Sequence, residues 1–148
     1  MQAMTISTIL FVCTGNTCRS PLAEGLAQKW LDDHGCRGWL AVSAGVHAYE
    51  GMPTSEETIH ALSDRGVAFD GTSKPLTQAM AKEAKAVFCM SRRHLNIAKE
   101  LTDNAQLLDP ARDIADPIGQ NQSVYDDLAD YLEPLIACKL ETLTKQGA

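Results

Sequence analysis

Residues 9–21 read Ile-Leu-Phe-Val-Cys-Thr-Gly-Asn-Thr-Cys-Arg-Ser-Pro. The four apolar residues at the start are typical of a strand buried inside a parallel sheet, and the proline suits the first turn of a helix. In open α/β sheets, the polar loop between such a strand and the next helix binds phosphate groups, because backbone N–H groups and the helix N-terminus attract anions. The stretch therefore predicts an α/β fold with an anion site at the carboxyl end of its first strand.

This loop carries a nucleophile and a phosphate clamp. Cys13 and Arg19 are separated by five residues. The positive field of a curled loop should keep Cys13 as a thiolate near neutral pH, and the planar guanidinium of Arg19 suits two phosphoryl oxygens. A plainer interpretation makes Cys13 a small apolar residue that ends a strand, but it leaves Gly15, Asn16 and Arg19 unexplained. The residues expected to contact phosphate are Thr14, Gly15, Asn16, Thr17, Cys18 and Arg19.

Three further residues shape the loop. Gly15 leaves room where the backbone must approach a ligand, and Asn16 tolerates the left-handed conformation that a tight loop demands. Ser20 is expected either to cap the following helix or to donate a hydrogen bond to the Cys13 thiolate.

Residues 11–21 resemble the signature of the low-molecular-weight protein tyrosine phosphatases, and the likeness covers nearly the whole chain. The later matches are Ser43-Ala44-Gly45, Pro75-Leu76-Thr77 and Asp116-Pro117. The resemblance implies a protein phosphatase that needs no metal or cofactor, with Cys13 as nucleophile, Arg19 as phosphate clamp and Asp116 as proton donor. It also implies a hydrogen-bond web that holds the loop open, made by Asn16, Ser20 and Ser43. Gly71 departs from the family pattern, which often has a histidine near this position to support the asparagine.

A general acid must protonate the group that leaves when Cys13 attacks phosphorus. Asp116 lies in a loop shaped by Pro117 and Gly119, directly before a helical segment. Asp109 and Asp113 compete for the role, and Asp109 also precedes a proline, so the residues alone favour Asp116 only slightly. The resemblance to the family's Asp-Pro motif decides for Asp116. The four histidines, His34, His47, His60 and His94, show no metal-ligand spacing.

The expected substrate pocket consists of Thr17, Tyr49 and Ile118. The resemblance makes phosphotyrosine in proteins the leading substrate, with Tyr49 as an aromatic wall. Thr17 favours a rival, because bacterial protein-arginine phosphatases resemble this sequence with threonine there, whereas tyrosine-specific relatives usually have a larger aliphatic residue. The segment around Ile118 also lacks the tyrosines that flank a phosphotyrosine ring in many relatives.

Other interpretations of the loop remain open. The resemblance implies that Cys18 closes a disulfide with Cys13 after peroxide attack, although Cys18 can equally fill space beneath the loop. Arsenate reductases use the same loop, but they need a second, closely spaced cysteine relay, and Cys89 has no partner a few residues on. A noncatalytic phosphate-binding module does not account for Cys13, Arg19 and Asp116 together.

The alternation of apolar runs with helical patterns predicts one domain over residues 1–148: a three-layer, flavodoxin-like α/β sandwich around a four-stranded parallel sheet. Thr54 to Glu57 form a capping-box pattern, Ser91 is expected to cap another helix, and Pro134 should kink or divide the C-terminal helix. The expected strands are residues 6–13, 39–43, 86–90 and 106–108.

Charge and cysteine content limit the partners. The net charge of −6 argues against nucleic-acid binding and against docking on anionic membranes. Five scattered cysteines suggest no secreted disulfide framework, so the expected location is the cytoplasm. The expected partner is a phosphorylated protein; the oligomeric state is not predicted.

Overall fold

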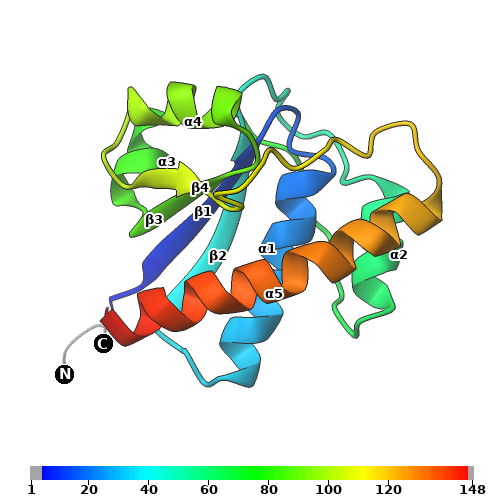
Figure 1. The fold of residues 1–148 in the computed structure, drawn as a ribbon, viewed down its shortest axis with the longest axis horizontal. Coiled ribbons are helices and arrows are strands. Elements are labelled where there is room, and N and C mark those ends of the chain that lie inside the picture. The colour runs from blue at the N-terminus through cyan, green and yellow to red at the C-terminus, as the bar shows by residue number, and fades with distance from the viewer. Residues whose placement is uncertain (1–4, 147–148) are drawn as a thin grey trace.

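A parallel sheet of four strands forms the middle layer of the computed structural model, which describes residues 5–146 (Figure 1). The strand order is β2-β1-β3-β4. The strands are β1 (Ser7–Cys13), β2 (Trp39–Gly45), β3 (Ala86–Cys89) and β4 (Ala105–Leu107). The helices are α1 (Arg19–Asp33), α2 (Glu56–Ser63), α3 (Gln78–Glu83), α4 (Arg92–Lys99) and α5 (Gln122–Gln146). This order and the helices on both faces confirm the predicted flavodoxin-like three-layer sandwich.

The two faces of the sheet have separate apolar cores because strand side chains alternate. Ile9 and Phe11 of β1 belong to the core beneath α1, α2 and α5. Leu10 and Val12 point the other way and pack with residues of α3 and α4. All four side chains are fully buried, which explains the uninterrupted apolar run at the start of the chain.

The site lies where the chain changes direction across the sheet. From β1 the chain moves to β2 at one side, then crosses back to β3 on the other side of β1. The carboxyl end of β1 is therefore a topological switch point, the usual ligand position in such sheets. The segments that follow β3 and β4 approach β1 there: Met90 donates its backbone N–H to Val12 of β1 (3.1 Å), and Ile114 donates to Met90 (2.8 Å).

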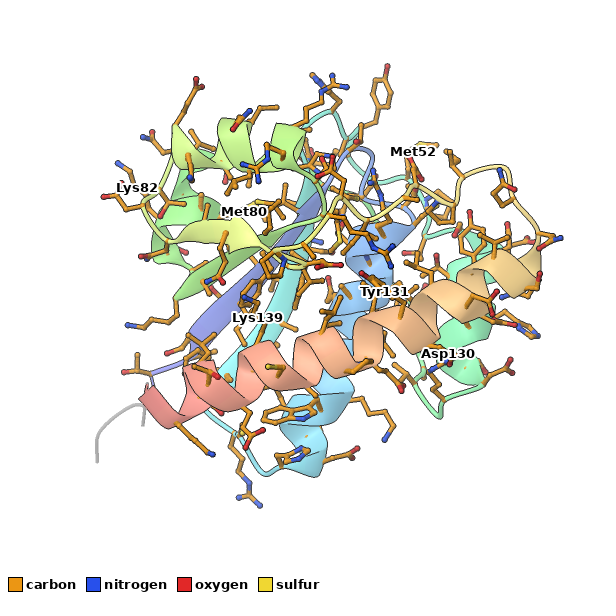
Figure 2. The ribbon with its side chains drawn as sticks, viewed as in Figure 1. Met52, Met80, Lys82, Asp130, Tyr131 and Lys139 are labelled. Atoms are coloured by element: carbon orange, nitrogen blue, oxygen red, sulfur yellow. The ribbon has the colours of Figure 1, made fainter. Side chains whose placement is uncertain are left out.

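The C-terminal helix corrects one expectation, because α5 runs undivided through Pro134. Proline removes one backbone donor from the helix, but Leu132 and Ile136 on either side are buried against α1 and the sheet. This packing outweighs the local preference of proline to break a helix. Polar contacts add to it: Lys139 donates to Gln106 of β4 at 2.9 Å, and Arg65 of the α2–α3 connection pairs with Asp130. Figure 2 labels Lys139 and Asp130 on α5.

The pattern from Thr54 to Glu57 opens α2 as predicted, and of the two roles expected for Ser20, capping α1 is not the one observed. Ser55 caps α2, accepting from the Thr58 backbone N–H at 3.3 Å, whereas the Thr54 hydroxyl donates to the Gly71 carbonyl at 2.9 Å. Cys18 occupies the cap position of α1, so Ser20 lies inside the first helical turn. Ser91 caps α4 as predicted. The short helix α3, capped by Thr77, was not predicted from the sequence.

None of the helices between residues 5 and 146 combines the length and apolar character needed to cross a membrane.

Candidate active site

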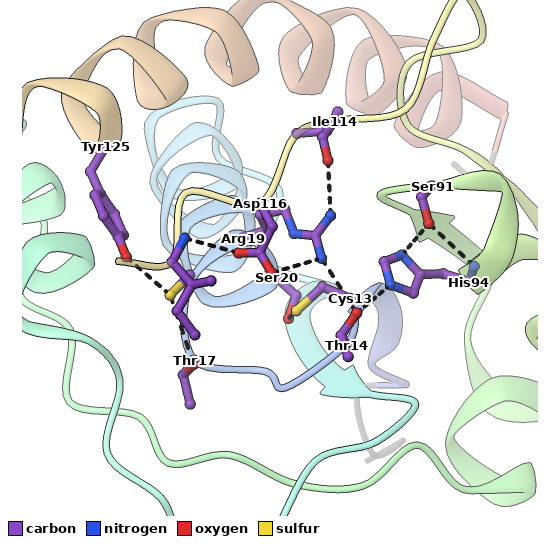
Figure 3. A network of polar contacts seen from close by, with 12 residues as sticks. Cys13, Thr14, Thr17, Arg19, Ser20, Ser91, His94, Ile114, Asp116 and Tyr125 are labelled. Atoms are coloured by element: carbon purple, nitrogen blue, oxygen red, sulfur yellow. Dashed lines mark hydrogen bonds and ion pairs between the residues drawn. The ribbon is translucent and has the colours of Figure 1, made fainter. Parts of the chain in front are cut away.

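The loop from Thr14 to Cys18 curls between the end of β1 and the start of α1 (Figure 3). Asn16 has φ +58°, the left-handed conformation expected for it, which costs a side chain of this kind less than most others. Among the described residues other than its two chain neighbours, the atom nearest to the Cβ position of Gly15 is Thr17 Oγ1, at 3.9 Å. The expected role of Gly15 in admitting a ligand therefore stays a prediction.

The Asn16 side chain holds the loop in this shape from behind. Its Nδ2 donates to Ser20 Oγ (2.8 Å) and Ser43 Oγ (2.9 Å), as predicted for this web. Its Oδ1 accepts the backbone N–H of Lys74 at 3.0 Å. A backbone amide therefore supports the asparagine in a chain that has Gly71 where the family often has a histidine nearby.

Glu24 extends this web, and the sequence analysis did not identify it. Ser43 Oγ donates to Glu24 Oε1 at 2.6 Å. Burial raises the pKa of the Glu24 carboxyl, while the hydrogen bond from Ser43 and the charge of Lys74 oppose that rise. The contact orients the Ser43 hydroxyl, so that its oxygen is free to accept from Asn16.

Gly45, from the second family-like motif, brings the end of β2 against the loop. A Cβ at this position would lie 2.4 Å from the Thr14 carbonyl oxygen and 3.0 Å from the Asn16 nitrogen. His47 donates its backbone N–H to the same Thr14 carbonyl at 3.0 Å. The absence of a side chain therefore permits the close packing that fixes the loop from this side.

Cys13 lies at the floor of the loop, with 3% of its surface exposed. Its Sγ is 2.9 Å from Ser20 Oγ. Ser20 accepts from Asn16 with its oxygen, which leaves its own proton to donate to the sulfur. Of the two roles expected for Ser20, the structure supports the hydrogen bond to Cys13.

Arg19 reaches across the loop and is almost fully buried. Its Nη1 donates to the Ile114 carbonyl (2.8 Å), and its Nη2 donates to Thr14 Oγ1 (3.4 Å). The same Nη2 lies 3.6 Å from Asp116 Oδ2. These contacts fix the plane of the guanidinium beside Cys13, the arrangement that clamping a phosphoryl group requires (Figure 3).

The structure separates the three candidate acids. Asp116 is half-exposed beside Arg19, and its Oδ1 accepts the backbone N–H of Ile118 at 3.1 Å, so its own loop orients it. Asp109 is buried and accepts from the Tyr131 hydroxyl, which lowers the pKa of its carboxyl together with the Ala111 backbone N–H. Asp113 accepts the backbone N–H of Arg92 at 2.9 Å. Among the three aspartates, Asp116 is the one that lies beside the guanidinium of Arg19.

The expected pocket residues lie on three different loops. Tyr49 and Ile118 are 80% and 65% exposed, and Thr17 is half-buried. The loop of Tyr49 is fastened by Ser73, whose hydroxyl donates to the Tyr49 carbonyl and accepts the Met52 backbone N–H (2.9 Å). Ser73 precedes the Lys74 amide that supports Asn16, so one short segment positions both the loop of Tyr49 and the loop from Thr14 to Cys18.

Cys18 has partners other than Cys13. Its Sγ lies 3.4 Å from the Tyr125 hydroxyl and 3.8 Å from Thr17 Oγ1. Tyr125 comes from α5 and is buried, and burial together with the contact to Cys18 raises the pKa of its hydroxyl. The disulfide implied by the family resemblance stays a prediction, since the two thiols are free and hydrogen-bond to different groups here.

His94 is a site residue that the sequence analysis did not single out. Its ring, 2% exposed, lies between Thr14 Oγ1 (2.8 Å from Nε2) and Ser91 Oγ (2.9 Å from Nδ1). Burial, together with the charges of Arg19 and Arg93, lowers the pKa of His94 to about 4. The ring is therefore neutral at physiological pH. Because 80 residues separate it from Thr14, no local sequence pattern announces the contact.

Acid should destabilise the folded protein through His94. Its pKa is about 4 when folded and about 6.5 when unfolded, so between these values the unfolded chain binds a proton that the folded chain does not. Stability therefore falls as the pH drops through this window, by at most about 3 kcal/mol. Urea unfolding at pH about 7 and about 4.5 tests this, with His94→Leu expected to lose less stability on acidification than the wild type. Equal losses would contradict the prediction.

A surface cluster of His60, Asp64 and Asp126 places its ligand atoms within 4.8 Å of one another where α2 meets α5. His60 and Asp64 form an exposed pair at 3.5 Å, and Asp126 accepts from Gln122 at 3.0 Å. These ordinary contacts account for the cluster.

The model of the family described as low molecular weight phosphotyrosine protein phosphatase matches residues 8–148. A protein-arginine-phosphatase of Bacillus subtilis is 32% identical over 93% of this chain and 97% of its own length. The low molecular weight protein-tyrosine-phosphatase Etp of Escherichia coli is 30% identical over 90% and 92%. A solved YwlE arginine phosphatase variant with a phosphorylated active-site serine has a TM-score of 0.84 at 31% identity, covering 94% of both chains. The chain belongs to the low molecular weight phosphotyrosine protein phosphatase family.

Proposed function

We propose that this chain dephosphorylates phosphotyrosine in proteins through a phosphocysteine intermediate on Cys13. The observation that supports this best is the meeting of three groups at one loop: the Cys13 thiol, the Arg19 guanidinium and the Asp116 carboxyl, with Arg19 Nη2 3.6 Å from Asp116. Nucleophile, clamp and acid are the parts that phosphoryl transfer to a side chain requires. Turnover of a phosphotyrosine peptide, with a phosphoenzyme trapped by acid quenching, tests the proposal.

The reaction has two displacement steps. In the first, the Cys13 thiolate attacks phosphorus, the bond from phosphorus to the tyrosine oxygen breaks, and Asp116 gives its proton to the leaving phenolate. In the second step, water attacks the phosphorus of the phosphocysteine, and Asp116 takes up a proton from this water. The bond from phosphorus to sulfur breaks, and the sulfur leaves as the thiolate. The Ser20 hydroxyl, 2.9 Å from Sγ, stabilises that thiolate as attacking and as leaving group.

Phosphoarginine is the second candidate substrate, and Thr17 favours it. The loop position of Thr17 carries a short, branched side chain with a hydroxyl, and the exposed Ile118 beside Asp116 brings no aromatic ring. A protein-arginine-phosphatase is among the relatives that match more than nine-tenths of the chain. With phosphoarginine the bond that breaks joins phosphorus to nitrogen, and Asp116 protonates the leaving guanidine.

Replacing Thr17 by isoleucine should shift the balance between the two substrates. The larger side chain narrows the slot for a guanidinium and adds apolar contact for a phenyl ring, so the ratio of phosphotyrosine to phosphoarginine kcat/KM should rise at least roughly tenfold. The two kcat/KM values are measured on peptides of one sequence that carry either phosphotyrosine or phosphoarginine. Thr17→Val keeps the shape of the side chain and removes only the hydroxyl, so as the matched control it separates the loss of the hydroxyl from the effect of the added bulk in Thr17→Ile. An unchanged ratio in Thr17→Ile would remove Thr17 from substrate selection.

Arsenate reduction is disfavoured by the position of Cys89. A relay needs thiols that reach the active site as thiolates. Cys89 is fully buried in β3, and burial raises the pKa of its thiol to about 12.

The cysteines and charge also support a setting for the reaction. All five thiols are free, which favours a reducing compartment such as the cytoplasm. The net charge of −6 favours a protein substrate over nucleic acid or an anionic membrane. The inferred partner is a phosphorylated protein.

A further inference from the structure

His94 lies in α4, which follows β3. Its side chain contacts Thr14 in the loop that follows β1. The two strands are neighbours in the sheet, so their carboxyl ends place these segments together at the switch point. The His94 ring is enclosed there between Ser91 of its own helix and Thr14 of the loop. Thr14 in turn accepts from Arg19 Nη2 at 3.4 Å. A continuous line of contacts thus joins α4 to the guanidinium (Figure 3).

We propose that His94 is a positioning residue that fixes the Thr14 hydroxyl and, through it, the Arg19 guanidinium against the bound phosphoryl group. This inference rests on the proposed phosphatase function. This support for the loop is separate from the Asn16 web behind it and from the Ile114 carbonyl that holds the other arm of Arg19.

The proposed role requires one assignment of the protons along this line. Ser91 Oγ accepts the His94 backbone N–H as the helix cap at 3.4 Å, and in this assignment its own proton goes to His94 Nδ1. Nε2 of the neutral ring then carries the ring proton and donates to Thr14 Oγ1. That oxygen accepts from both His94 and Arg19. The Thr14 O–H is left as a donor for a phosphoryl oxygen.

The ring can play this role only while it is neutral. A protonated ring would place a second cation beside Arg19 and would take away the acceptor for the Ser91 proton. The charged groups that act on the ring are Arg19 at the start of α1, Arg93 of α4, and Asp113 and Asp116 of the segment between β4 and α5. Burial and the two arginines outweigh the two aspartates, which keeps the imidazole neutral.

A purely structural role for the ring makes a different prediction. The cap of α4 needs only the His94 backbone N–H and the Ser91 hydroxyl, so the helix start survives without the imidazole. If the ring merely filled space, its loss and the loss of the Thr14 hydroxyl would act independently. If the ring acts through Thr14, the second loss adds nothing to the first.

A double-mutant cycle on the full chain tests the proposal. His94→Leu and Thr14→Val should each lower kcat/KM for p-nitrophenyl phosphate, and weaken competitive inhibition by inorganic phosphate, roughly tenfold. The double variant should be no worse than the poorer single variant. The exposed His34→Leu, at the far end of α1, is the matched control and should keep wild-type activity.

Two further measurements keep the test decisive if His94→Leu folds poorly. His94→Gln presents an amide donor near the position of Nε2 and should recover most of the lost activity. Ring ¹H–¹⁵N correlation spectra of the wild type should show a proton on His94 Nε2 that shifts when inorganic phosphate binds. Multiplied losses in the double variant, no rescue by glutamine, or a proton on Nδ1 would each overturn the role of His94. Wild-type protein that turns over no phosphomonoester would instead overturn the proposed function.

Discussion

Replacing Cys13 by serine is expected to abolish turnover while leaving phosphate binding nearly intact. The sulfur is the atom that forms the bond to phosphorus, and a serine hydroxyl is protonated at neutral pH and leaves poorly once phosphorylated. The kcat for a phosphotyrosine peptide should fall by more than about 10⁴-fold. Inorganic phosphate should bind within a few-fold of the wild-type affinity, because the clamp of Arg19 and the loop N–H groups remain.

The exposed Cys138→Ser is the matched control for Cys13→Ser and should keep full activity. Isothermal titration with phosphate and peptide turnover are measured on both variants. A serine variant that retained a tenth of the activity would remove Cys13 as the nucleophile. Loss of phosphate binding together with turnover would show that the sulfur holds the loop in shape, rather than only attacking the substrate.

The loop from Cys13 to Arg19 was predictable from sequence because the residues that determine its shape are close together in the chain. Cys13, Gly15, Asn16 and Arg19 lie within seven residues, and the left-handed φ of Asn16 is a property of one residue in a tight loop. The apolar run before Cys13 predicted a buried strand, and in the structure its alternating side chains enter two different cores. Local patterns of this kind were enough to predict the fold class and the position of Cys13 at the floor of the loop.

What the sequence left out depends on contacts between distant segments. His94 meets Thr14 across 80 residues, and Lys74 meets Asn16 across 58. The Lys74 contact uses a backbone amide, so no side chain at that position signals it. Pro134 shows the converse, because a local rule for breaking helices yields to packing on both sides of it.

For the three candidate acids, both the local sequence pattern and contacts between distant segments matter. Asp109 and Asp116 both precede proline, and the local pattern barely separates them. The fold separates them, because the Tyr131 hydroxyl from α5 takes up Asp109, whereas Asp116 remains beside Arg19. A cavity of about 390 Å³ lies between the Asp116 loop and α5, lined among others by Pro117, Val124 and Tyr131.

Asp116→Asn should therefore cost most where the leaving group most needs a proton. With phenyl phosphate, a poor leaving group, kcat/KM should fall about 10²- to 10³-fold; with p-nitrophenyl phosphate the loss should be about tenfold or less. Asparagine keeps the Oδ1 that accepts from Ile118, so the loop shape is retained while the acid is lost. Asp113→Asn, three residues away and exposed, is the matched control and should change either rate less than about twofold. The slope of log kcat/KM against leaving-group pKa is the measurement, and it should steepen in Asp116→Asn alone. Parallel lines for variant and wild type would mean that Asp116 acts through the charge of Arg19 and not by giving up a proton.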